Sequence, residues 1–270
     1  KSAPLIFHEG AWLELNPEKL SVTLNFLDDE SQSSRMTVIE ALRLGYGFAD
    51  KKDIIPVISF SAEGWIKHLI NAASEGLPEI TQPPSFIGEL RHYQQNGLSW
   101  LSFLSKMGIG GCLADDMGLG KTIQFLAMLL DERENAQDYI GQGLHVEPTL
   151  LVVPMSILDN WQNEASKFAP TLKVYLHHGP ARFGGELFVQ KAQETDLVVT
   201  TYSLAYRDEE LLSKIRWGRI ALDEAQNIKN HSTKQTQAVR RLIQQQIHLE
   251  DRNTVCQRLA LTGTPLENHL

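Results

Sequence analysis

Eight residues near the middle of the chain read Asp115-Asp116-Met117-Gly118-Leu119-Gly120-Lys121-Thr122. An apolar run precedes them and an amphipathic run follows, which is the strand–loop–helix setting of a phosphate-binding loop. The two glycines would let backbone N–H groups approach phosphate oxygens closely. Lys121 would neutralise the β- and γ-phosphates, and the Thr122 hydroxyl would bind Mg²⁺. Asp115 stands where the usual pattern has its first glycine, but the setting favours a nucleotide site over a chance glycine turn.

A second candidate site is an apolar run that ends in two carboxylates, Arg219-Ile220-Ala221-Leu222-Asp223-Glu224-Ala225-Gln226. Ligands of open α/β sheets bind outside the carboxyl ends of the strands. Asp223 would hold Mg²⁺ through water, and Glu224 would orient or deprotonate the attacking water. Adjacent acids are common on protein surfaces, so the buried-strand position and the loop upstream carry the argument. The two stretches together predict a nucleoside-triphosphate hydrolase with Lys121 and Glu224 as catalytic residues.

Short β-branched runs alternate with amphipathic runs over the part of the chain that contains both stretches. The expected strands are 109–114, 150–153, 172–176, 197–201, 219–222 and 258–262, and the expected helices are 122–133, 156–168, 186–194 and 232–246. This alternation predicts an α/β fold with a mostly parallel, doubly wound sheet that is covered by helices on both faces. Residues 131–148 are polar and contain glycine, so a mobile loop is expected there.

The chain before this region has a different pattern. Three prolines between Gly76 and Phe86 predict an extended linker over residues 76–89. It would join a partial, small α+β accessory domain at 1–75 to a lobe at 90–270. In the accessory segment the expected elements are a hairpin (5–8 and 11–15), helices at 16–27, 37–44 and 61–74, and a strand at 54–60. We find no catalytic constellation there.

Composition excludes several classes of protein. The 270 residues include 42% apolar and 21% charged residues, which excludes a disordered tail, a coiled coil and a collagen-like repeat. No apolar run approaches the roughly 18 residues of a membrane helix, and the start of the chain lacks a signal-peptide pattern. Two cysteines are too few for a disulfide framework. A cytoplasmic protein without a membrane partner is expected.

The net charge of −8 argues at first against a nucleic-acid partner. However, residues 1–86 carry 7 basic and 12 acidic groups, whereas the remaining residues carry 18 and 21. Since binding to phosphates needs only a local basic face, the acidity does not exclude a nucleic-acid substrate.

The chain after residue 90 resembles the first motor lobe of superfamily-two helicase-like ATPases of the SWI/SNF (switch/sucrose-non-fermenting) type, in particular bacterial members. Six ordered motifs carry the resemblance: Leu90-Arg91-His92-Tyr93-Gln94, the phosphate loop with the preceding Leu113-Ala114, Val152-Val153-Pro154-Met155-Ser156-Ile157-Leu158-Asp159-Asn160-Trp161-Gln162-Asn163-Glu164, Val199-Thr200-Thr201-Tyr202-Ser203, Asp223-Glu224-Ala225-Gln226-Asn227-Ile228-Lys229-Asn230 and Leu261-Thr262-Gly263-Thr264-Pro265-Leu266-Glu267-Asn268. Asp115 agrees with the usual loop of this family. Gln226 stands where the family usually has histidine.

The resemblance implies a RecA-like P-loop lobe that uses ATP and Mg²⁺ and acts on double-stranded DNA. The implied ATP-binding residues are Gln94, Met117, Gly118, Leu119, Gly120, Lys121 and Thr122, the metal ligands Thr122 and Asp223, the DNA-backbone contacts Ser156, Asn160, Thr201, Tyr202 and Lys229, and the coupling residues Gln226, Thr262 and Thr264. Gln94 would read the adenine edge, since an amide can donate and accept at once. Helix capping by Ser156 and core packing of Tyr202 are equally open.

The family's second lobe, which supplies arginines to the ATP site, is not in this chain. We therefore expect weak ATP binding and poor hydrolysis by the chain alone. A bacterial protein of this kind would be nucleoid-associated. Two alternatives stay open: an RNA-directed or polymerase-recycling motor, and a nucleotide-sensing module that does not hydrolyse. Residues 248–257 look inserted, and residues 1–75 resemble the tail of the accessory domain that precedes the motor in bacterial members.

Overall fold

The computed structural model describes residues 5–8, 11–14, 77, 79–136, 147–248 and 256–263. The chain divides into two units, Lys1–Gly76 and Leu77–Leu270. In the first unit β1 (Leu5–His8) pairs antiparallel with β2 (Ala11–Glu14), which confirms the expected hairpin. The other elements predicted before residue 75 lie outside the described residues.

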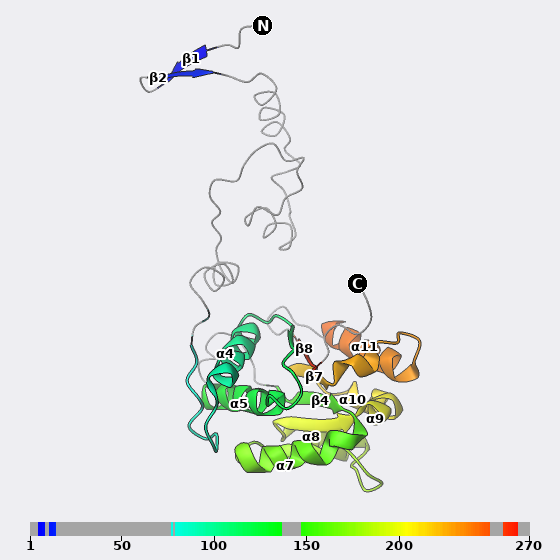
Figure 1. Ribbon diagram of the computed structural model, residues 1–270. Helices are drawn as coiled ribbons and strands as arrows, with labels where there is room; N and C mark the ends of the chain where they lie inside the picture. Colours follow the sequence, from blue (N-terminus) through cyan, green and yellow to red (C-terminus); the bar gives the residue numbers. More distant parts are fainter. Residues whose placement is uncertain are drawn as a thin grey trace. The chain divides into compact units, whose positions relative to one another are not determined.

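The second unit contains a six-stranded sheet in the order β3-β8-β7-β4-β6-β5, and every neighbouring pair is parallel (Figure 1). The strands are β3 (Gly111–Leu113), β4 (Thr149–Val153), β5 (Val174–Leu176), β6 (Leu197–Thr201), β7 (Arg219–Asp223) and β8 (Gln257–Leu261). All residues of β4, β6 and β7 are buried, as expected of central parallel strands. The predicted parallel, doubly wound sheet is confirmed.

Helices cover both faces of this sheet. They are α4 (His92–Lys106), α5 (Lys121–Glu134), α7 (Leu158–Phe168), α8 (Gly185–Gln193), α9 (Tyr202–Arg207), α10 (Glu209–Leu212) and α11 (Lys234–His248), with two 3₁₀ turns, η2 (Met155–Ile157) and η3 (Ala225–Ile228). Successive residues of the central strands point to opposite faces of the sheet and contribute to two separate hydrophobic cores. Leu151 and Val199 pack with α4, α5 and α7, whereas Leu150 and Val198 pack with α8, α9, α10 and α11. This alternation places α4, α5 and α7 together on one face.

Three helices were not expected from the sequence. Helix α4 contains Gly97 and three serines, which lower the helix propensity and obscure the apolar stripe. It is held instead by burial of Leu98, Leu101 and Leu104. Helices α9 and α10 are each too short to show a helical period.

The mobile loop predicted over residues 131–148 is wrong in its first part, because α5 continues through Glu134. Glu132 is buried and pairs with Arg219 at the start of β7, with 3.0 Å between Arg219 Nη1 and Glu132 Oε2. A buried carboxylate of this kind needs a charged partner, and the partner lies 87 residues away in the chain. Residues 137–146 lie outside the described residues.

Residues 79–90, most of the expected linker, form neither helix nor strand. They are fastened to the lobe. The Ile87 backbone N–H donates to the Phe168 carbonyl at 2.8 Å, and the buried Phe86 ring stacks on Phe168. The Ile80 N–H donates to Ser99 Oγ in α4 at 3.0 Å. The segment therefore packs across α4 and α7.

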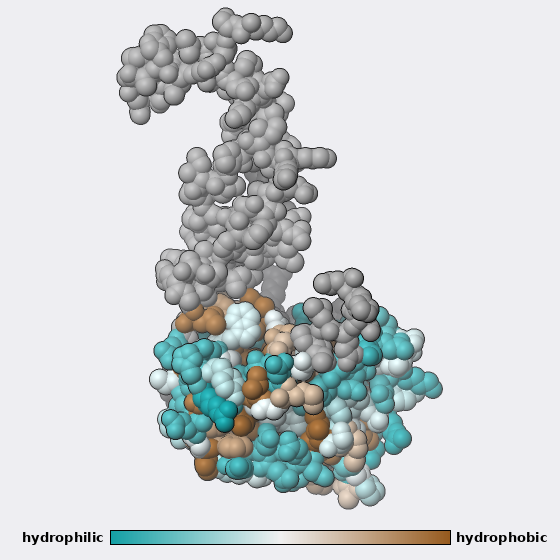
Figure 2. Space-filling model, viewed as in Figure 1, coloured by the Kyte–Doolittle hydropathy of each residue, from teal (hydrophilic) through white to brown (hydrophobic). Residues whose placement is uncertain are grey.

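The face of the lobe visible in Figure 2 mixes hydrophilic and hydrophobic residues. Within the described part of the chain, no helix combines the length and apolar character needed to cross a bilayer.

Candidate active site

The predicted phosphate loop connects β3 to α5 and exposes Met117, Gly118 and Leu119. Gly118 and Gly120 have φ angles of +83° and +82°, a region that glycine enters without strain. Gly120 is also the N-cap of α5, so the free N–H groups of the first helical turn face the loop. This backbone can bind an anion.

Lys121 is folded back onto the loop. Its Nζ donates to the carbonyl oxygens of Asp115 at 2.8 Å and Asp116 at 3.1 Å. The ammonium group is thus held beside the backbone that would cradle phosphates. A bound triphosphate would offer the same group charged oxygen acceptors, which form stronger hydrogen bonds than carbonyls do.

Gln94 lies beside the loop and is buried rather than exposed at the start of its helix. Its Oε1 accepts from the Arg91 backbone N–H at 3.0 Å, and its Nε2 donates to the Leu119 carbonyl at 3.1 Å. A Cβ on Gly120 would stand 2.5 Å from Gln94 Nε2, so this contact also requires glycine at that position. The side chain joins α4 to the loop, and its contact with adenine stays a prediction.

The two acids lie at the carboxyl end of β7, as expected. Asp223 is buried; its Oδ2 accepts from Trp161 Nε1 at 2.7 Å and its Oδ1 from the Glu224 backbone N–H at 2.8 Å. Burial raises the pKa of Asp223, while these two hydrogen bonds and the Lys121 charge oppose that rise. Because β3, β8 and β7 are parallel neighbours in the sheet, the phosphate loop after β3 and the acidic pair lie at the same edge of the sheet.

Glu224 has a left-handed backbone, with φ of +47°, and is the one non-glycine residue with positive φ in the described parts of the chain. Such a conformation costs on the order of 1–3 kcal/mol and persists where the surroundings enforce it. Here the conformation turns the carboxylate toward Gln226, whose Nε2 donates to Glu224 Oε2 at 2.6 Å.

Gln226 also connects Glu224 to the end of the neighbouring strand β8. Thr262, just after β8, donates its hydroxyl to Gln226 Oε1 at 2.8 Å. The next residue touches the phosphate loop, since a Cβ on Gly263 would lie 2.9 Å from Met117 Cγ. The amide therefore bridges two predicted site residues, and the structure brings Glu224, Gln226 and Thr262 together. Thr264 lies outside the described residues.

The residues predicted to contact nucleic acid divide into two groups. Ser156, Asn160 and Lys229 are exposed on η2, on α7 and after η3, although Asn160 Nδ2 also donates to Glu164. No side-chain cap is formed by Ser156.

Thr201 and Tyr202 are buried, which for Tyr202 is the core packing that the sequence left open, and their contact with DNA stays a prediction. Thr201 Oγ1 accepts from the Leu204 N–H as the N-cap of α9. The Tyr202 hydroxyl donates to the Asp223 carbonyl at 2.7 Å, and burial raises its pKa. The side-chain oxygens of both residues thus form hydrogen bonds within the lobe.

Mg²⁺ fits the donors at this site. Thr122 offers a hydroxyl and Asp223 a carboxylate, which are hard oxygen ligands. No group of three or more His, Cys, Asp or Glu residues in the described ranges could hold a metal ion. Phosphate and water oxygens would have to complete the coordination, which is how Mg²⁺ usually binds with nucleotides.

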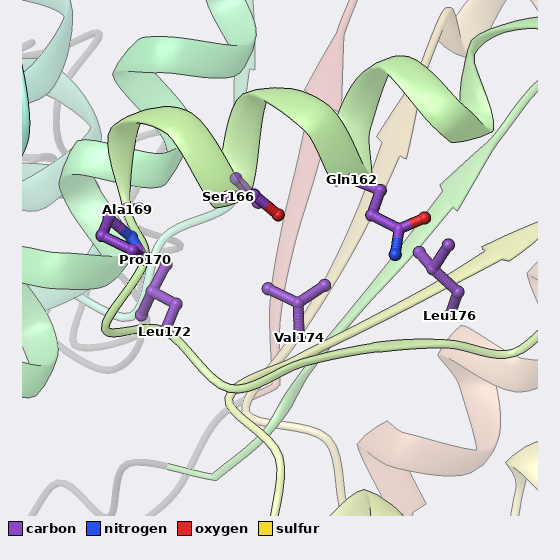
Figure 3. A pocket seen from close by; sticks show the side chains of 8 residues that line it. Gln162, Ser166, Ala169, Pro170, Leu172, Val174 and Leu176 are labelled. Carbon is purple, nitrogen blue, oxygen red and sulfur yellow. The ribbon is translucent and has the colours of Figure 1, made fainter.

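A separate cavity of about 230 Å³ lies between α7 and β5 (Figure 3). Val174 and Leu176 face Gln162 and Ser166 of α7 across it. None of its lining residues belongs to the predicted site, and it carries no charged group that would bind a triphosphate.

Trp161 is a site residue that sequence reasoning missed. Its indole is fully buried, packs edge-on against Phe125 of α5 at 5.7 Å and donates to Asp223 from 62 residues away. A tryptophan on an amphipathic helix is normally a core residue, so the available signal is only that a buried indole N–H needs an acceptor.

We expect Trp161→Phe to raise the Mg²⁺ concentration required for half-maximal ATP hydrolysis by about tenfold, because Asp223 loses a hydrogen bond of roughly 1.5–3 kcal/mol. A Mg²⁺ titration of the complete motor measures this. The control is Trp217→Phe, which removes another buried indole that donates to a backbone carbonyl, that of Leu212. An equal shift in both variants would contradict a specific role for Trp161.

A parallel sheet with a phosphate loop after β3 and paired acids at the carboxyl end of β7 defines a RecA-like P-loop lobe. Comparison with known families places it further: the SNF2-related domain family matches residues 93–270, and the chain belongs to that family. The SWI/SNF-type resemblance is thereby confirmed.

Relatives and solved structures agree. A Bacillus subtilis protein named "Putative ATP-dependent helicase/translocase YwqA" is 40% identical over 98% of this chain and 28% of its own length. The Schizosaccharomyces pombe TATA-binding protein-associated factor mot1 is 34% identical over 88% of this chain and 12% of its own. The Sulfolobus solfataricus SWI2/SNF2 ATPase core in complex with dsDNA has a TM-score of 0.56 and 38% identity, covering 71% of this chain and 35% of that one. The chain thus spans less than a third of the length of these two relatives.

Proposed function

We propose that this chain is the ATP-binding first lobe of an ATP-dependent double-stranded-DNA translocase. The observation that carries the proposal is the hydrogen-bonded path from Glu224 through Gln226 to Thr262, whose neighbour Gly263 adjoins the phosphate loop. Such a path joins the group that activates water to the strand beside the nucleotide. The solved relative in complex with dsDNA supports duplex DNA as the substrate.

In this proposal the residues of the lobe have separate tasks. Lys121 leaves the carbonyls of Asp115 and Asp116 and pairs with the β- and γ-phosphates. Thr122 and Asp223 hold Mg²⁺, which neutralises charge on the phosphates when bound. Glu224 orients the attacking water and accepts its proton. Gln226, which is hydrogen-bonded to both residues, would couple changes at Glu224 to Thr262.

Ser156 on η2, Asn160 on α7 and Lys229 just after η3 are exposed and would contact the DNA backbone. Tyr202 and Trp161 would contribute indirectly, because both donate to Asp223 and thereby join the ends of β6 and α7 to the metal ligand. Hydrolysis would require a second lobe, since an arginine supplied in trans is worth roughly 10³–10⁵ in turnover.

The substrate class is tested by ATP hydrolysis of the complete motor with duplex DNA, single-stranded DNA and RNA. Duplex DNA should stimulate hydrolysis most, and this chain alone should hydrolyse ATP poorly under every condition. Stimulation by RNA in place of duplex DNA would establish the RNA-directed alternative. Absence of hydrolysis despite ATP binding would establish a nucleotide-sensing module.

A further inference from the structure

One buried side chain of α5 contacts both ends of the phosphate loop. Gln124, one turn into α5, is fully buried. Its Nε2 donates to Asp115 Oδ2 at 2.7 Å and lies 3.3 Å from the Gly120 carbonyl oxygen. Asp115 begins the loop and Gly120 ends it, so a single amide ties the two ends together.

Asp115 gives this contact its significance. It occupies the position where the common phosphate-loop pattern has glycine, and its carbonyl accepts one of the two hydrogen bonds from Lys121. An aspartate side chain beside a triphosphate site would repel the ligand if it turned toward the phosphates. The hydrogen bond from Gln124 keeps this carboxylate directed at α5 instead.

The packing of α4 on α5 leaves room for this amide at one residue. A Cβ on Gly97 would collide with Gln124 Oε1 and would stand 2.8 Å from Gln124 Cδ. Within the described residues, Gln124 Oε1 is buried without a hydrogen-bond partner. The amide is therefore held only by the hydrogen bonds of Nε2. Its Oε1 fits because residue 97 is glycine.

We propose that Gln124 is a positioning residue for ATP: it acts through Asp115, with Gly97 providing the space, and holds the phosphate loop in its binding conformation. The inference rests on the proposed function, since it assumes that the loop binds ATP. This role would explain why Asp115 replaces the glycine of the common pattern. An aspartate that is hydrogen-bonded to Gln124 restricts the backbone at a position where glycine would be free to move.

The test is the affinity of the full chain for methylanthraniloyl-ATP with Mg²⁺, measured by fluorescence. Gln124→Met keeps the size of the side chain and removes the donor, and it should weaken binding about tenfold, as loss of one hydrogen bond to a charged group predicts. In an Asp115→Gly background the same change should alter affinity by at most about threefold, because its acceptor is gone.

Two further variants make the result specific. Gln246→Met removes another buried glutamine, one whose amide bonds the Ile215 carbonyl and the Trp217 N–H, and should leave nucleotide affinity unchanged. Gly97→Ala should displace the Gln124 amide and weaken binding to a similar extent as Gln124→Met. If circular dichroism shows that Gln124→Met does not fold, the Gly97→Ala variant is used for the test instead.

The outcomes are distinguishable. If the unchanged chain does not bind the nucleotide at any concentration, the proposed function fails and this inference fails with it. If the unchanged chain binds but Gln124→Met binds equally well, or loses the same factor in the Asp115→Gly background, only the inference is overturned.

Discussion

Glu224→Gln should keep ATP bound while its hydrolysis by the complete motor falls by about 10²–10⁴, the range attributed to general acid–base catalysis. The change preserves the size of the side chain and an oxygen that can accept from Gln226 Nε2, which lies 2.6 Å from Glu224 Oε2. It removes the negative charge that orients water and accepts a proton. Nucleotide binding and single-turnover hydrolysis, measured on the same preparation, separate the two effects.

The matched control for this experiment is Glu210→Gln, a change to an exposed acid on α10. It should leave both binding and hydrolysis as they are. Turnover of Glu224→Gln within about threefold of the unchanged motor would remove Glu224 from its assigned role.

Lys121→Met should weaken ATP binding by about 100-fold. The ammonium group has two acceptors in this structure, the carbonyls of Asp115 and Asp116, and would exchange them for phosphate oxygens. Each charge-assisted hydrogen bond lost is worth roughly 1.5–3 kcal/mol, and every 1.4 kcal/mol is tenfold in affinity. Methionine retains most of the apolar stem, so the change tests charge and hydrogen bonding rather than packing.

Binding of the fluorescent nucleotide measures this effect, and Lys214→Met, an exposed lysine between α10 and β7, is the control. If Lys121→Met and Lys214→Met bind the nucleotide equally well, the loop does not bind phosphates through Lys121. The effect should also shrink for a nucleoside monophosphate, because the β- and γ-phosphates are then absent.

The sheet could be predicted from sequence because its central strands are continuous apolar runs. Leu150–Val153 and 197–201 are buried on both faces and lack polar alternation. Helix α4 could not be predicted in the same way, since Gly97 and its serines follow a packing requirement against α5 rather than a helical propensity. Long-range burial decided that element.

The candidate site shows the same division. The phosphate loop and the acidic pair were predictable because their chemistry is local in sequence. The partners of these groups were not: Trp161 reaches Asp223 across 62 residues, and Thr262 reaches Gln226 across 36. A helical glutamine such as Gln124 is typical of a solvent-facing position, and only the fold shows that it is buried under the loop. The inward hydrogen bond of Tyr202 to the Asp223 carbonyl was not predictable either, because sequence position at a strand end does not reveal which way the side chain turns.

Translocation along duplex DNA can be measured by displacement of a third strand. A fluorescent oligonucleotide is annealed in the major groove of a duplex, and the complete motor is added with ATP. We predict ATP-dependent release of the third strand with the duplex left intact, and loss of release in Glu224→Gln. ATP hydrolysis stimulated by duplex DNA without release of the third strand, or equal release by Glu224→Gln, would contradict the account.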